Sequence, residues 1–173
     1  MPALTGQPRR SSVWEGRAAA LASAAAAFYL AFLAARLGFF RIFSLWAAYD
    51  DEGYMMQSMR SYFDGHPLYD QVYTQYGPAY FLVQWVIHGI AQVPLNHTAV
   101  RLITLAFWLA TAAAAGEIVR RLTRMPVLAL IAALHVFIHI SPLINEPGHP
   151  QAFLGLIVAL GCVIAAGQEG TLT

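Results

Sequence analysis

The sequence predicts an all-α membrane protein: a polytopic helical bundle of about four transmembrane spans, with juxtamembrane amphipathic helices in its first external loop. Of its 173 residues, 58% are hydrophobic, and the mean hydropathy is +0.54. Several of its apolar runs approach the roughly 20 residues that a helix needs to cross a bilayer. A soluble domain of this length does not need such runs, so these observations favour the membrane class.

The charge balance argues against nucleic-acid binding, and the cysteine content excludes an internal disulfide and a thiolate metal site. All ten basic residues are arginine, nine residues are acidic, and the formal net charge is +1. The chain therefore offers no basic surface for nucleic acid. Its single cysteine, Cys162, lies inside an apolar run, which excludes an internal disulfide and a thiolate metal cluster.

The chain is expected to divide into two parts. Residues 1–16 carry two prolines and the pair Arg9 and Arg10, and we expect a disordered cytoplasmic lead-in there. Residues 17–173 are expected to form a single transmembrane domain. Its first crossing is the uncharged run 18–35, interpreted as a signal anchor that stays attached. Arginines precede this run, which places the N-terminus in the cytoplasm and the following segment outside.

Three consecutive carboxylates, Asp50, Asp51 and Glu52, follow the first span in a chain of which only 11% is charged. Acidic groups at this position can bind a cation, a polar head group or a substrate hydroxyl. The alternative is a solvated helix cap, since Asp51 is a suitable N-cap for a helix that stops near Gly65. Apolar residues recur at near-helical spacing between them, which predicts an amphipathic helix lying on the membrane.

Four apolar runs follow, at residues 78–93, 99–119, 127–144 and 152–166. The first is short for a span and contains polar residues, so we expect it to be interfacial or re-entrant, with a full crossing as the alternative. The basic cluster that ends the second run then lies in the cytoplasm. On this topology residues 145–149 lie on the same face as the carboxylates, and the two remote segments could build one site.

Several short motifs carry a resemblance to a known family. They are Asp51-Glu52 after the first span, Gly65-His66-Pro67-Leu68-Tyr69, Tyr76-Gly77-Pro78, Val100-Arg101-Leu102, a basic cluster and a Pro/Glu/His turn. In this order they resemble the N-terminal part of GT-C membrane glycosyltransferases. The nearest branch is the protein mannosyltransferase and lipid A aminoarabinose transferase group, and the resemblance covers about residues 17–167.

The resemblance implies an enzyme of the bacterial inner membrane that transfers a sugar from a polyprenyl-phosphate donor to an acceptor on the external side. Asp51 matches the family's catalytic aspartate, and Glu52 beside it is the second catalytic candidate. A later external loop supplies a second polar residue in the family, and Glu146 and His149 are the candidates here. Arg101 matches an arginine that would face the donor phosphate.

This chemistry suits the residue types. Displacing a polyprenyl phosphate from an anomeric carbon needs a base for the acceptor proton and positive charge for the leaving phosphate. Asp51 would be the base and Arg101 the stabiliser, with a divalent cation such as Mg²⁺ or Mn²⁺ that Asp50 or Glu52 could hold. A single displacement predicts inversion at the anomeric carbon.

Two further residues are candidates for substrate contact. Tyr76 could stack on a sugar, although a tyrosine near an apolar segment is also typical of the membrane interface. His66 lies in the polar loop, and its alternative is a structural role in the turn before Pro67.

Three alternatives concern the chain as a whole. GT-C enzymes of the resembled group have many more spans than four, so we expect an N-terminal portion of a longer transferase. A small transporter or channel subunit would use the carboxylates and the intramembrane histidines as an ion path. A non-catalytic assembly subunit would use small residues of the alanine-rich spans as contacts.

Overall fold

The computed structural model describes residues 11–44, 51–142 and 147–168, and these residues are mostly helical, with a loop at residues 64–77 and shorter connections elsewhere. The helices are α1 (Ser11–Ser44), α2 (Asp51–Phe63), α3 (Pro78–Gln84), the π-helix η1 (Trp85–Ile90), α4 (His97–Thr123), α5 (Pro126–Ile140) and α6 (Pro150–Gln168). The chain divides into two compact units at Leu33. The first unit contains α1 as far as Leu33, and the second contains the rest of α1 and every other helix.

Helix α1 is one continuous helix from Ser11 to Ser44. It therefore includes the end of the segment that was expected to be disordered and the aromatic stretch after the expected first span. The C-terminal part of α1 belongs to the second unit, where Ile42 is buried with Leu105 and Phe137. Gly38 allows this packing, because a Cβ there would lie 2.5 Å from Leu105 Cδ1.

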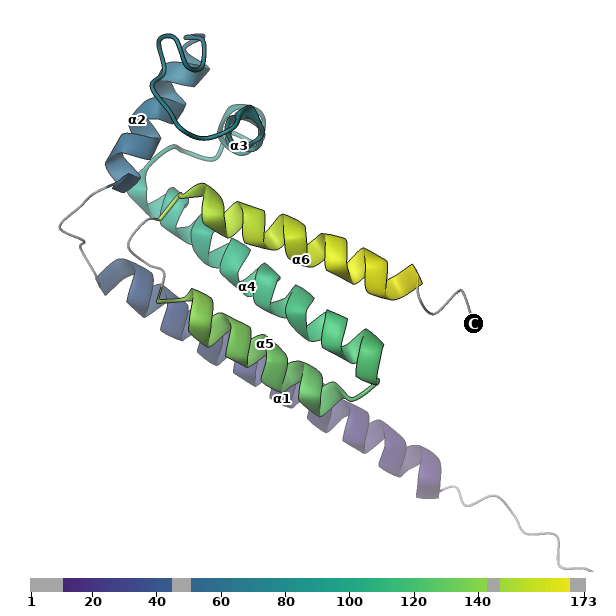
Figure 1. The fold of residues 1–173 in the computed structure, drawn as a ribbon. Helices are drawn as coiled ribbons and strands as arrows, with labels where there is room; N and C mark the ends of the chain where they lie inside the picture. The colour runs from purple at the N-terminus through teal and green to yellow at the C-terminus, as the bar shows by residue number, and fades with distance from the viewer. Residues whose placement is uncertain (1–10, 45–50, 143–146, 169–173) are drawn as a thin grey trace, which may run out of the picture. The chain divides into compact units, whose positions relative to one another are not determined.

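Helix α4 lies between α5 and α6 and packs against both (Figure 1). It begins at the N-cap Asn96, whose side chain accepts a hydrogen bond from Ala99 N at 2.9 Å. Its close approach to α5 occurs at Gly116, where a Cβ would lie 2.9 Å from the carbonyl oxygen of Ala129. A small residue is needed at this helix contact, as is common between membrane helices.

Three helices among the described residues are long and apolar enough to cross a membrane: Gly16–Ser44 within α1, then α4 and α6. Helix α5 fills the position of the predicted third span, at residues 127–144, but it has 15 residues. At 1.5 Å per residue it extends about 22 Å, against a hydrocarbon core of about 30 Å. The all-helical membrane class is confirmed, whereas a bundle of four full spans is not.

Residues 78–93 form no long helix. Helix α3 has 7 residues and η1 continues it for 6 more, so together they extend about 20 Å. This length is short for a crossing and favours the interfacial or re-entrant alternative over a full span.

Helix α2 lies where the amphipathic helix was predicted, and it ends as predicted at Gly65. Gly65 has φ +91°, Gly65 N donates to Tyr62 O at 3.0 Å, and His66 N donates to Ser61 O at 3.2 Å. These two bonds form a Schellman motif, in which glycine tolerates the left-handed conformation. The apolar face of α2 was expected to contact the membrane. In the structure, Met55, Met56 and Met59 on that face are buried against protein instead.

The methionine face of α2 packs on α3, on the loop between them and on the start of α4. The buried cluster consists of Met55, Met56, Met59, Val72, Tyr80, Phe81 and Val100. Burial of this apolar surface in a protein core removes it from both water and lipid. The helix is therefore a packed element of the loop region, and its position is fixed by side chains on α3 and α4.

Candidate functional site

A buried ion pair joins α2 to α4. Glu52, in the first turn of α2, is 2% exposed. The Arg101 guanidinium donates from Nε to both carboxylate oxygens, at 3.1 and 3.0 Å, and from Nη2 to Oε2 at 2.8 Å. Its Nη1 donates to the carbonyl oxygen of Ile42 at 3.0 Å. One arginine thus connects α4, α2 and the end of α1.

The pair follows from where each residue lies in its helix. A carboxylate near a helix N-terminus interacts favourably with the helix dipole, and Glu52 is in the first turn of α2. Arg101 lies one turn after His97 on α4, and His97 Nδ1 is 3.2 Å from Glu52 Oε1. His97 is half-exposed, whereas the two charged groups behind it are buried.

This arrangement changes the roles expected for two site residues. Glu52 was predicted beside the catalytic aspartate, and Arg101 was predicted to face a phosphate. The structure brings these two side chains together, and both Glu52 oxygens accept hydrogen bonds from Arg101. Glu52 and Arg101 do not belong to the lining of two small cavities near this end of the bundle, which both include Thr104 and His149.

The second polar segment, of which residues 147–149 are described, is hydrogen-bonded to the same end of α4. Gly148 N donates to Thr104 Oγ1 at 2.8 Å, and the Tyr80 hydroxyl donates to Gly148 O. The Tyr76 hydroxyl and His149 Nε2 are hydrogen-bonded at 2.5 Å. Thr104 is three residues after Arg101, so the first turns of α4 hold both remote polar segments, as the predicted topology required.

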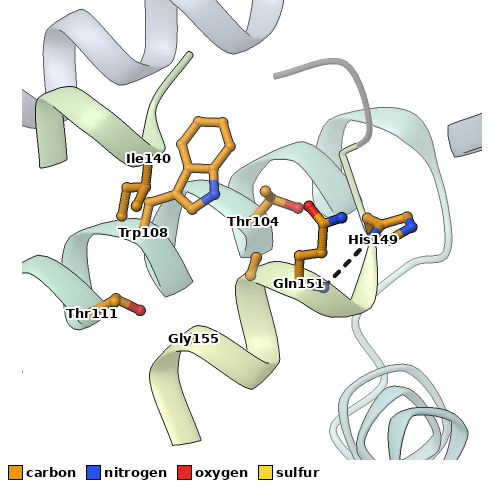
Figure 2. Close-up of a pocket in the computed structure, with 8 residues that line it drawn as sticks. Thr104, Trp108, Thr111, Ile140, His149, Gln151 and Gly155 are labelled. Atoms are coloured by element: carbon orange, nitrogen blue, oxygen red, sulfur yellow. Dashed lines mark hydrogen bonds between the residues drawn. The ribbon is translucent and has the colours of Figure 1, made fainter. Parts of the chain in front are cut away.

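A small cavity opens beside this turn (Figure 2). It lies between α4, the end of α5 and the start of α6, and it is lined by Thr104, Trp108, Thr111, Ile140, His149, Gln151, Ala152 and Gly155. Its volume of about 60 Å³ is far below the roughly 300–1,000 Å³ of typical small-molecule sites. It has room for a few water molecules or one functional group, but none for a whole sugar.

The other predicted site residues are distributed as follows. Asp51 begins α2, while Asp50 and Glu146 lie outside the described residues. His66 is exposed at the far end of α2, where its Nδ1 bonds to the carbonyl of Ser61 at 3.0 Å. This contact is the structural turn role that was its alternative. Tyr76 and His149 are brought together, although 73 positions separate them in the chain.

Sequence reasoning missed Thr104, Trp108 and Gln151 as neighbours of His149. Thr104 had one available signal, since its spacing of three from Arg101 places both near one face of a helix. Trp108 continues the same face by one turn and is 4% exposed. Gln151 had no comparable signal, because its position depends on the turn before α6.

A metal centre does not emerge from the described part of the chain. No three His, Cys, Asp or Glu side chains gather there in a way that could hold a metal ion. Both oxygens of Glu52, which was expected to hold a cation, accept hydrogen bonds from Arg101, so a cation there would compete with a buried guanidinium. Asp50, the other expected ligand, lies outside the described residues.

Comparison with known proteins adds no family assignment. No protein-family model, curated protein or solved structure matches the chain. The resemblance to GT-C transferases therefore rests on the motifs alone.

Tyr80 is expected to make stability depend on alkaline pH. Burial raises the pKa of its phenol well above the ordinary value of 10.0. The unfolded chain loses this proton near pH 10 while the folded protein keeps it, so stability falls as pH rises beyond 10, by up to about 1.4 kcal/mol per pH unit. Denaturant titrations from pH 9 to pH 11 should show a shallower fall for Tyr80→Phe, and equal slopes in both proteins would contradict this origin.

Proposed function

We propose that this chain is a membrane glycosyltransferase, or the N-terminal portion of one, of the GT-C kind. It would transfer a sugar from a polyprenyl-phosphate donor to an acceptor, with inversion at the anomeric carbon. The observation that carries the proposal is the meeting of two remote polar segments at one end of a membrane bundle. The start of α2, with Asp51, and the Gly148 to His149 turn are both bonded to the first turns of α4.

Asp51 has the role of general base in this proposal. It directly precedes Glu52, whose carboxylate is held by Arg101, so the backbone that carries Asp51 is fixed to α4. A base must be held within hydrogen-bond reach of the proton that it removes. We therefore assign Glu52 and Arg101 to positioning rather than to contact with the donor, which revises their expected roles.

His149 and Tyr76 supply the second half of the site. The hydroxyl of Tyr76 and the His149 ring are mutually bonded beside the small cavity, so they can share a proton with a bound hydroxyl. The size of the cavity suits one protruding group of a substrate whose larger part lies outside it. Because a cation at Glu52 would compete with the buried guanidinium of Arg101, we assign no step to a divalent cation.

The proposed location is a bacterial inner membrane, with the N-terminus in the cytoplasm and the site outside. Arg124 and His149 support this arrangement because they lie at opposite ends of α4. Arg124 follows its last residue, and His149 adjoins the turn that is bonded to Thr104. Membrane-impermeant labelling of single cysteines at these two positions should reach only His149→Cys from the periplasm.

The function is tested by transfer of a radiolabelled sugar from a polyprenyl-phosphate donor in membranes that contain the intact protein. We expect label to move to an endogenous acceptor and the anomeric configuration of the product to be inverted. Membranes without the protein are the control. A correctly folded protein that neither binds the donor nor transfers its sugar would overturn the proposal.

A further inference from the structure

A basic surface lies at the end of α4 opposite to the candidate site. It consists of Arg120, Arg121 and Arg124, with Glu117 as the single acid among them. Three cations and one anion leave a net charge of +2. Because the proposed sugar transfer uses the other end of the bundle, this surface does not depend on it.

The three arginines are not equivalent. Arg121 connects α4 to α6. Its Nε donates to Glu117 in α4 at 2.7 Å, and its Nη1 donates to the carbonyl oxygen of Val163 in α6 at 3.0 Å. Arg120 is 56% exposed and bonds to Glu117 through Nε and Nη2. An exposed ion pair of this kind contributes little to stability, so Arg120 can turn to a second anion at low cost.

Arg124 is the more unusual residue. It is exposed and caps α4 in the left-handed conformation, with φ +57°, where glycine is the residue that helices usually employ. Among the described residues its guanidinium has no hydrogen bond or ion pair, although its backbone N donates to Arg120 O at 2.9 Å. Arg124 thus combines a costly backbone conformation with an exposed cation at the C-terminal end of α4, where its charge also suits the helix dipole.

Exposed apolar side chains surround these arginines. Leu122, Met125 and Val127, at the turn between α4 and α5, are 59%, 56% and 67% exposed. Apolar side chains flanking long cationic ones are typical of the boundary between acyl chains and head groups, where arginine stems lie in the apolar layer and their guanidinium groups reach phosphate. The backbone bond from Arg124 N to Arg120 O places the two residues one turn apart along α4, and side chains of this length could reach a common phosphate from there.

We propose that this surface binds the head-group phosphate of an anionic phospholipid between Arg120 and Arg124. The exposed turn residues contact its acyl chains. Glu117 weakens the binding, because its carboxylate competes with the phosphate for Arg120.

The test measures lipid adducts of the intact chain by native mass spectrometry in detergent. Phosphatidylglycerol and phosphatidylcholine with identical acyl chains are titrated, and phosphatidylglycerol should bind more tightly. Arg124→Gln should lower its affinity about five-fold, and adding Arg120→Gln should lower it roughly 25-fold in total, from the contribution expected of each arginine at an anionic surface. Phosphatidylcholine affinity should not change.

Three matched variants separate lipid binding from folding and from total charge. Arg124→Gly should keep or raise thermal stability, since glycine accepts the positive φ, and should still lose phosphatidylglycerol affinity. Glu117→Gln should raise that affinity. Arg60→Gln, at an exposed position of α2, removes the same charge elsewhere and should leave it unchanged.

Three results would each overturn the proposal. The first is equal affinity for the two lipids, and the second is an equal loss in Arg60→Gln and Arg124→Gln. The third is displacement of phosphatidylglycerol by millimolar inorganic phosphate, which would show a site for the free anion rather than for a lipid.

Discussion

Arg101→Ala is expected to destabilise the protein by about 3–5 kcal/mol, the usual cost of removing one partner from a buried ion pair. The variant would leave the Glu52 carboxylate buried at 2% exposure without the three hydrogen bonds that Arg101 donates to it. It would also free the Ile42 carbonyl at the end of α1. Denaturant titration in detergent, followed by circular dichroism, measures the effect.

Two variants check the cause of this loss. Glu52→Met combined with Arg101→Met removes both charges and should recover most of the stability, because no unpaired charge remains buried. Arg60→Ala removes an exposed arginine whose side chain makes one hydrogen bond within the described residues, to Leu95 O at 3.3 Å, and should cost far less. If Arg101→Ala were as stable as Arg60→Ala, the ion pair would not hold α2 to α4.

The sequence predicted the helices well because their signals are local. Gly65 marks the end of α2 through a backbone conformation that few other residues tolerate. The N-cap Asn96, whose side chain bonds three residues ahead, is a local signal of the same kind, but the start of α4 was expected only at about residue 99. Uncharged runs of about twenty residues identify membrane helices without knowledge of their neighbours. The length of α1 was underestimated, because helical structure can continue through aromatic residues at the interface.

Contacts between remote segments could not be predicted in the same way. The resemblance placed both Glu52 and Arg101 in the site, but only their packing shows that each is the other's partner. The methionines of α2 were expected to face lipid, because one sequence cannot reveal that Tyr80 and Phe81 cover them. The meeting of the two polar segments agrees with the expectation that residues 78–93 do not cross the membrane, because that choice places both segments on one face.

Asp51→Asn is expected to lower sugar transfer by the intact enzyme about 10²–10⁴-fold, the range for loss of a general base. The fold should be unaffected, because Asn and Asp are equally suited to the start of a helix. Initial rates with the polyprenyl-phosphate donor measure the first effect, and denaturant titration measures the second. Undiminished transfer would remove Asp51 from the role of base.

Glu52→Gln is the matched control, because it removes the charge of the adjacent carboxylate without changing its size. We expect Glu52→Gln to lower the free energy of unfolding, since Arg101 would stay buried beside a neutral amide. Sugar transfer should fall only as far as α2 shifts. The two neighbours thus have opposite expected signatures: Asp51→Asn is stable and inactive, whereas Glu52→Gln is unstable. A Glu52→Gln protein with unchanged stability and no transfer would reverse the assignment, making Glu52 the reacting group and leaving Asp51 as a helix cap.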